Sequence, residues 1–341
     1  MRNLKRIILS YDYELFFGER SGTVLKSIIE PTNKLMDVME QNGFRGNFFV
    51  DYLMFRELEK LSDERAAADL NLLKEQIRDM VRRGHRVELH LHPHWIDAKY
   101  NGDGTWNFDD FTHYSLSSLD EETIVAMFKE GTDYLNKLAA EVEPGYKIVA
   151  FRAGGWAVQP FDKLKRAFME SGIVIDSSTS LGAYSIKENQ SYDFRVMPDK
   201  EVYRFSDDVC KEDANGQFLE VPITSFHRNI IYVLVDRIYG GKLKYFEKIS
   251  DGTHNRKSDG KSVARLSFFD RLKDSYKLMF SFSMQSPLTV KKALCSQKKR
   301  SLLCYIDHPK DFSKATEKGI ASLNGRCESI NYIDLIKTED K

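Results

Sequence analysis

The sequence predicts an α/β fold, in which alternating strands and helices form a parallel sheet or barrel. Short apolar runs alternate with helical patterns through the first half of the chain, and repeated strand–helix units of this kind are typical of parallel sheets. Polar residues also follow several of the apolar runs directly, which is where active residues lie in such folds. The length of 341 residues is ordinary for a single barrel enzyme, and a hydrophobic content of 42% can support a sizeable core.

Five apolar runs in the first half are the predicted strands. They span residues 6–11, 47–50, 86–91, 146–151 and 173–176. Their length and continuous apolar character are typical of strands buried inside a parallel sheet. Asp12, Glu14, His90, His94 and Arg152 lie at or just beyond the ends of three of these runs. Because parallel strands end at the same edge, we expect these side chains to share that edge.

Four helical patterns connect or follow these strands. They span residues 31–42, 70–83, 118–141 and 161–171. Pro31 suits the first turn of the first helix, while Gly43 and Gly84 stop the first and second helices. The segment Ser118-Leu119-Asp120-Glu121 has the pattern of a capping box, which predicts that the third helix opens there.

The second half of the chain is less regular. Residues 218–223 and 302–306 are expected strands. A basic stretch at residues 291–300 is interpreted as a solvated surface, with contact to a phosphate-bearing substrate as the alternative. No internal repeat, low-complexity tract or clear linker interrupts the sequence. We therefore expect one domain over residues 1–341, with irregular insertions in about 187–300.

Composition narrows the classes of function. Lysine plus arginine and aspartate plus glutamate both number 51, so no net charge favours binding to nucleic acid. The four cysteines show no C-x-x-C spacing, and reduced thiols in a cytoplasmic protein fit best. The apolar run near the N-terminus is too short for a signal-peptide core, and no run is long enough to cross a bilayer. We expect a cytoplasmic protein, for which peripheral contact with a membrane stays open.

Three histidines stand within five residues, in the segment Glu88-Leu89-His90-Leu91-His92-Pro93-His94-Trp95. The whole chain has only eight histidines, so three of them within five residues indicate a specific role. Neutral imidazole is the commonest protein ligand for zinc and related metals. Asp12 and Glu14, on either side of Tyr13, supply carboxylates for the same kind of site. These residues predict a centre for a divalent metal, with adventitious metal binding as the alternative.

The same residues carry a resemblance to a known family. The segments Leu9-Ser10-Tyr11-Asp12-Tyr13-Glu14, His90-Leu91-His92-Pro93-His94 and Phe151-Arg152-Ala153-Gly154-Gly155-Trp156 resemble, in order and spacing, successive motifs of the polysaccharide deacetylases, carbohydrate esterase family 4. Asp307-His308-Pro309 resembles the late histidine motif of that family. The resemblance implies a distorted β/α barrel and removal of acyl groups from amino sugars with a divalent metal, usually zinc.

The resemblance also implies a set of metal ligands. His90 and His94, at positions i and i+4, match the two metal-binding histidines of the family. The family usually places an aspartate where this chain has Tyr13, so Glu14 is the expected carboxylate ligand, as in members with an Asp-x-Asp arrangement. His92 matches no ligand position and is interpreted as a wall or hydrogen-bonding residue, with a role as third ligand as the alternative.

The catalytic roles carry over from the same motifs. Asp12 resembles the catalytic base, Arg152 resembles the arginine that orients this base, and His308 resembles the general acid. Asp176 resembles the acid that tethers the late histidine. Without the motifs, Arg152 would be interpreted as a structural ion-pair partner and His308 as an ordinary loop histidine.

The resemblance implies a metal-dependent hydrolase, with zinc as the expected ion, that removes an acyl group from an amino sugar or glycan intermediate of surface-glycan synthesis. N-acetyl is the expected acyl group. One alternative is a deformylase or other amidohydrolase that acts on a nucleotide- or lipid-linked sugar. Another is a catalytically silent glycan-binding protein, which the presence of Asp12 and Arg152 disfavours because binding alone requires no base.

Overall fold

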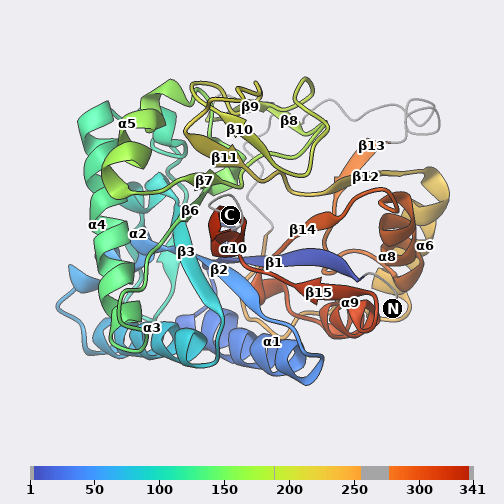
Figure 1. The fold of residues 1–341 in the computed structure, drawn as a ribbon. Helices are drawn as coiled ribbons and strands as arrows, with labels where there is room; N and C mark the ends of the chain where they lie inside the picture. The colour runs from blue at the N-terminus through green and yellow to red at the C-terminus, as the bar shows by residue number, and fades with distance from the viewer. Residues whose placement is uncertain (1–3, 188, 255–275, 338–341) are drawn as a thin grey trace.

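A nine-stranded sheet forms the centre of the computed structural model, which describes residues 4–187, 189–254 and 276–337 (Figure 1). The strand order is β10-β11-β7-β6-β3-β2-β1-β14, and β15 also pairs with β1. Neighbouring strands run parallel except for the antiparallel pair β10 and β11. The strands are β1 Lys5–Tyr13, β2 Gly46–Asp51, β3 Arg86–Leu91, β6 Ala150–Ala153, β7 Ile175–Asp176, β10 Tyr203–Phe205, β11 Phe218–Glu220, β14 Leu302–Asp307 and β15 Cys327–Ser329.

The predicted fold class, an α/β fold with a distorted barrel of parallel strands, is confirmed. The sheet curls through its strands (Figure 1). Within the described ranges its two edge strands, β10 and β14, do not pair with each other, so the barrel is open on one side.

Two of the predicted strands are shorter than expected. Residues 146–149 stay outside β6, and the amides of Val149 and Ala150 both donate to Glu88 Oε2 at 2.9 Å. A buried side chain thus accepts hydrogen bonds that a neighbouring strand would otherwise accept. β7 contains only Ile175 and Asp176 of the predicted residues 173–176.

Five helices connect the strands of the first half and pack against the sheet and one another (Figure 1). They are α1 Glu30–Gln41, α2 Tyr52–Glu59, α3 Glu64–Arg82, α4 Glu121–Ala140 and α5 Asp162–Ser171. α2 is absent from the sequence-based prediction because its apolar residues, Tyr52 to Phe55, are consecutive, so that no helical period stands out.

The start of α4 differs from the predicted capping box. Asp120, rather than Ser118, is the N-cap residue, and its Oδ1 accepts a hydrogen bond from the amide of Thr123 at 2.8 Å. Ser118 belongs to the preceding 3-10 turn, Leu116–Ser118. An aspartate at this position also interacts favourably with the positive end of the helix dipole.

Smaller elements surround the large sheet. Three strand pairs are β4 Lys99–Tyr100 with β5 Trp106–Asn107, β8 Tyr184–Lys187 with β9 Gln190–Asp193, and β12 Ser225–Arg228 with β13 Tyr276–Met279. The remaining helices are α6 Ile230–Gly241, α8 Pro287–Ser296, α9 Lys314–Leu323 and α10 Tyr332–Lys337, and a π-helical turn spans Leu25–Ile29. The predicted insertions at 187–300 thus contain short elements, although residues 188 and 255–275 lie outside the described chain. The single-domain organisation stays a prediction.

Apolar side chains fill both faces of the sheet. On β1, Ile7 and Leu9 belong to the larger core, whereas Ile8 between them belongs to a smaller core. Tyr332 and Leu335 of α10 complete this smaller core, which places the C-terminal helix against the middle of the sheet (Figure 1). In the described part of the chain, no helix combines the length and the apolar character that crossing a bilayer requires.

Candidate active site

The carboxyl ends of neighbouring parallel strands bring the candidate residues to one edge of the sheet. In the strand register, Asp51 of β2 lies opposite His90 of β3, and His90 lies opposite Arg152 of β6. Asp12 lies near the end of β1 at the same edge, because Tyr11 beside it pairs with Asp307, the last residue of β14. The expected grouping of residues from separate strands therefore follows from their register.

Asp12 and Arg152 form a buried ion pair. Arg152 Nη1 donates to Asp12 Oδ1 at 2.6 Å, and Arg152 itself is fully buried. The guanidinium also donates to the Ser177 carbonyl and to the Ser10 hydroxyl, both at 2.8 Å, which fixes its plane. Burial raises the pKa of Asp12, but the charges of Arg152, His90 and His308 together outweigh burial and hold this pKa below its ordinary value. Asp12 is therefore an oriented, ionised carboxylate.

Glu14 lies against two of the three clustered histidines. Its Oε2 is 2.6 Å from His92 Nε2 and 3.1 Å from His90 Nε2. All three side chains are buried, and their ligand atoms lie close enough together to surround one metal ion. The structure therefore brings together Glu14, His90 and His92 as a group of possible metal ligands.

The donor atoms of this group fit a metal site. His90 Nδ1 lies 2.6 Å from the Arg152 carbonyl, which only accepts hydrogen bonds, so Nδ1 carries the proton and Nε2 points toward Glu14. A carbonyl partner on the second nitrogen is the usual arrangement around a metal-binding histidine. Burial lowers the pKa of His90, but the Asp12 and Glu14 carboxylates outweigh burial and raise it to about 9. The same carboxylates would attract a metal cation at this position.

His94 occupies a different environment from His92. His92 has an extended backbone, with φ −114° and ψ 92°, so it projects on the same side of the chain as His90, two residues before it. His94 lies beyond Pro93 in the 3-10 turn Pro93–Asp97, and its ring stacks on Tyr114 at a centroid distance of 5.3 Å. The structure thus places the expected ligand His94 in an aromatic wall beside the ligand group, 4.9 Å from the His92 ring.

Asp51 and Gly154 hold His92 in place, and neither was predicted from sequence. Asp51 Oδ2 accepts from Trp95 Nε1 at 2.6 Å, and its Oδ1 accepts from the His92 amide at 3.3 Å. Burial raises the pKa of Asp51 to about 7. A Cβ atom at Gly154 would lie 2.6 Å from His92 Nδ1, so only glycine leaves room for this ring. The position of Asp51 at the end of an apolar run was the available signal.

Lys310 is a second site residue that sequence reasoning missed. Its Nζ donates to Glu14 Oε1 and to the Leu15 carbonyl, both at 2.7 Å, and the side chain is buried. Burial raises the pKa of Glu14, but Lys310 and His92 outweigh burial and hold it well below the ordinary value. Lysine is rarely buried without a partner. The signal in the sequence was its place directly after the motif Asp307-His308-Pro309.

His308 faces both carboxylates of the site. Its Nε2 lies 3.4 Å from Glu14 Oε1 and 3.8 Å from Asp12 Oδ2. Burial lowers the pKa of His308, but these acidic neighbours outweigh burial and raise it. The carboxylate beside its other nitrogen is Asp311, at 3.6 Å from Nδ1. Asp176, the acid expected there, instead accepts hydrogen bonds from the amide and hydroxyl of Ser178.

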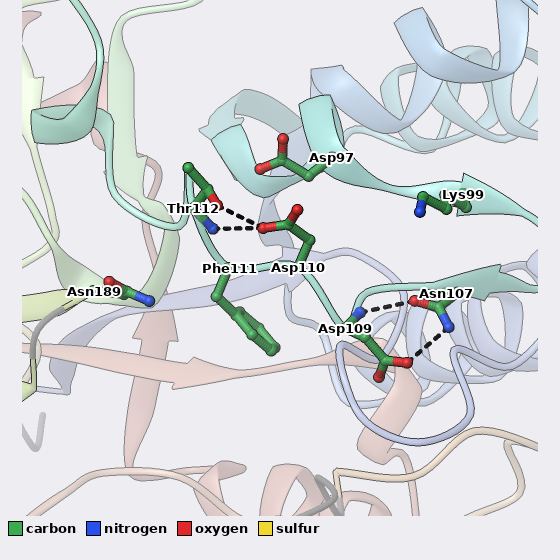
Figure 2. Close-up of a pocket in the computed structure, with 8 residues that line it drawn as sticks. All are labelled: Asp97, Lys99, Asn107, Asp109, Asp110, Phe111, Thr112 and Asn189. Atoms are coloured by element: carbon green, nitrogen blue, oxygen red, sulfur yellow. Dashed lines mark hydrogen bonds between the residues drawn. The ribbon is translucent and has the colours of Figure 1, made fainter. Parts of the chain in front are cut away.

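A polar cavity of about 770 Å³ lies beyond the aromatic wall (Figure 2). It is lined by Asp97, Lys99, Asn107, Asp109, Asp110, Phe111, Thr112 and Asn189. The Phe111 ring that lines it lies 6.3 Å from the His94 ring, which in turn neighbours His92. Contacts between the Phe111, His94 and His92 rings therefore connect the lining of the cavity to the ligand group.

No protein-family model and no curated protein matches the chain. A protein assigned as a polysaccharide deacetylase from Mycobacterium smegmatis has a similar solved structure, with 12% identity, a TM-score of 0.48, and coverage of 99% of this chain and 91% of that chain. A 4-alpha-glucanotransferase from Thermococcus litoralis is similar at 13% identity and a TM-score of 0.49, over 98% of this chain but 40% of that chain.

A third solved structure is a family 4 carbohydrate esterase from Bacillus anthracis. It is similar at 14% identity and a TM-score of 0.25, over 44% of this chain and 49% of that chain. At these identities and scores the likeness carries no information on the reaction. The solved structures similar to this chain thus include a protein of the family that its sequence motifs resemble.

Proposed function

We propose that this protein is a metal-dependent hydrolase that removes an acyl group from the nitrogen of an amino sugar. The observation that carries the proposal is the meeting of a metal-ligand group with acid and base side chains at one sheet edge. Glu14, His90 and His92 supply the ligand atoms. Asp12 and His308 lie beside them, with His308 Nε2 within 4 Å of both carboxylates. Metal-assisted amide hydrolysis combines all three functions at one place.

Zinc is the metal that we propose, held by Glu14, His90 and His92. One carboxylate and two imidazoles form a donor set that occurs in catalytic zinc sites, where a further position stays open. When bound there, the ion would polarise the acyl carbonyl and lower the pKa of a water molecule. The positions of the rings favour His92 over His94 as the second histidine ligand.

Asp12 and His308 are placed to move the protons of the reaction. Arg152 holds Asp12 Oδ1 and keeps the carboxylate ionised, so Asp12 can accept a proton from the attacking water as general base. His308 faces this carboxylate, and its raised pKa favours the protonated imidazole. A protonated His308 can donate to the departing amine nitrogen, which is a poor leaving group without that proton.

The substrate that we propose is an N-acetylated amino sugar in an intermediate of surface-glycan synthesis, processed in the cytoplasm. The polar cavity has the size of a small-molecule site. Its aspartates and asparagines can bind sugar hydroxyls, and Phe111 offers a ring face to a sugar. All four cysteines are free thiols, which supports a reducing compartment.

Acetate release from N-acetylated UDP-sugars by the zinc-loaded protein tests the proposal. Wild type should turn over, lose activity on chelation and regain it with zinc. Asp12→Asn should bind the same amount of zinc but turn over about a hundredfold more slowly or worse. Asp133→Asn, which changes an exposed aspartate on α4, is the control and should behave as wild type. Loss of zinc from Asp12→Asn would make Asp12 a ligand, and a protein that binds no zinc would overturn the proposal.

A further inference from the structure

Helix α6 buries a carboxylate and exposes its apolar residues. Of its twelve residues, all within the described ranges, only Asp236 is buried. Asp236 Oδ1 accepts from the Ser286 amide at 2.9 Å and the Thr289 hydroxyl at 2.6 Å, and Oδ2 accepts from Arg228 at 3.0 Å. Polar contacts therefore fix α6 against the start of α8, in contrast to a surface helix that packs its apolar stripe on the core.

The outward face of α6 carries a line of large apolar side chains. Ile231, Leu234 and Ile238 are 60%, 50% and 52% exposed, and Leu243 just after the helix is 58% exposed. The spacing i, i+3 and i+7 places the first three on one side of the helix. Single exposed apolar residues are ordinary, but a contiguous group of them marks an interaction surface.

Basic side chains surround this apolar line. Arg237, Lys242 and Lys244 are exposed on and just after α6. On the neighbouring helix α8, Leu288 is 45% exposed and Lys291 is exposed one turn later. Glu247 is the one exposed carboxylate in the segment 229–249. An apolar line flanked by cations is the pattern of a helix that lies in the interface of a membrane with anionic headgroups.

We propose that α6 docks this protein on an anionic lipid bilayer, with Ile231, Leu234 and Ile238 inserted among the headgroups. Arg237, Lys242 and Lys244 then face the lipid phosphates. Charge complementarity selects this occupant, because a purely apolar partner would cover Arg237 and Lys242, which form no ion pair with the described residues, without supplying a counter-charge. Lys244 already lies 3.8 Å from Glu247 Oε2. The helix lies flat on the surface and does not cross the bilayer, in keeping with its length of twelve residues.

The chain after α6 leads directly to the candidate active site. Lys248 Nζ lies 3.0 Å from Asp311 Oδ1, and His254 Nε2 lies 2.8 Å from the same oxygen. Asp311 is the carboxylate beside His308. Docking through α6 therefore holds the rim of the site near the bilayer, and a sugar attached to a lipid carrier becomes the substrate class. This last step rests on the proposed function, whereas docking itself does not.

Co-sedimentation of the full chain with lipid vesicles tests the proposal. Binding should be strong to phosphatidylcholine mixed with phosphatidylglycerol, weak to phosphatidylcholine alone, and should fall as salt rises. The combined substitutions Ile231→Ser, Leu234→Ser and Ile238→Ser should abolish binding. Arg237→Gln and Lys242→Gln should each weaken binding about fivefold. Ile186→Ser, on β8, removes a side chain that is 81% exposed and should bind as wild type does.

Several outcomes of this experiment would overturn the docking proposal. Equal binding by wild type and the triple serine variant would do so, as would no binding to the mixed vesicles. A dimer in sedimentation equilibrium that the triple variant lacks would assign the face to a second copy of the chain. Circular dichroism should show that each variant is folded. Asp12→Asn should bind vesicles as wild type does, so a failure of the hydrolase proposal stays separate from a failure of docking.

Discussion

Lys310 Nζ donates to Glu14 Oε1 at 2.7 Å, and both side chains are buried at the edge where β1 and β14 end. Removing one partner of a buried ion pair leaves an uncompensated charge. Lys310→Met should therefore lower the free energy of unfolding of the metal-free protein by about 3 kcal/mol. Because a metal ion would replace the lost cation beside Glu14, zinc should raise the Tm of this variant more than that of wild type.

Urea unfolding and thermal melts with and without zinc check this prediction. Lys26→Met is the matched control, because Lys26 forms a similar ion pair with Glu30 on an exposed surface, where such pairs contribute little. The control should match wild type in both measurements. Equal zinc-induced shifts in Lys310→Met and wild type would mean that Lys310 and the metal do not act on the same carboxylate.

Substitution of His92 and of His94 by alanine should show which of the two histidines is a metal ligand and which belongs to the aromatic wall. His92→Ala should lose most of the bound zinc, because its Nε2 lies 2.6 Å from Glu14 Oε2. His94→Ala should retain the metal, because its ring packs on Tyr114 in the aromatic wall. Elemental analysis of the purified variants measures the zinc bound per chain. Retention by His92→Ala together with loss by His94→Ala would restore the ligand set that the i, i+4 motif implies.

His308→Ala should affect amide and ester substrates to different extents. An amine leaving group needs a proton, whereas the leaving group of an aryl acetate needs little protonation. Turnover of the acetylated amino sugar should fall about a hundredfold, and turnover of the aryl acetate should fall much less. Steady-state kinetics on both substrates measures the ratio. A similar loss on both would show that His308 supports the site without donating the proton.

His85 should make the protein less stable as the solution is acidified. Its Nδ1 accepts from the Gly46 amide at 3.0 Å, and burial lowers its pKa to about 4. The unfolded chain takes up a proton near pH 6.5, whereas the folded protein resists it down to about pH 4. Stability is therefore complete above about pH 6.5 and falls by about 3 kcal/mol as pH drops toward 4.

Urea unfolding between these pH values checks the prediction for His85. In His85→Gln the loss of stability on acidification should be smaller, because the titrating group is gone. His227→Gln changes an exposed histidine and should keep the pH dependence of wild type. Parallel curves for wild type and His85→Gln would show that another group causes any acid destabilisation.

The strands could be predicted from sequence because buried parallel strands are continuous apolar runs. The same property hid α2, since only Asp51 separates the apolar residues that end β2 from the apolar run Tyr52–Phe55 that begins the helix. The ligand set that we propose differs from the one that the family motif implies. The motif implies His90 and His94 at positions i and i+4, whereas the extended backbone at His92 places His90 and His92 on one side of the chain and favours that pair.

Sequence patterns could not reveal that the charged residues Lys310 and Asp51 are buried in the site. Lysine and aspartate are usually exposed, so neither Lys310 nor Asp51 stood out from its neighbours. Their roles arise from contacts with Glu14 and Trp95, which come from distant parts of the chain. Only the arrangement of the strands shows that these pairs meet.

The position of β1 between β2 and β14 has a consequence for synthesis on the ribosome. Asp12 leaves the exit tunnel long before β14 and the neighbouring His308 that directly follows this strand. Until then one edge of β1 has no partner and can attract other chains or chaperones. The Tyr332 hydroxyl, which hydrogen-bonds Ser177 at 2.8 Å beneath Arg152, emerges later still. A nascent or C-terminally truncated chain therefore holds the early motifs without an assembled site.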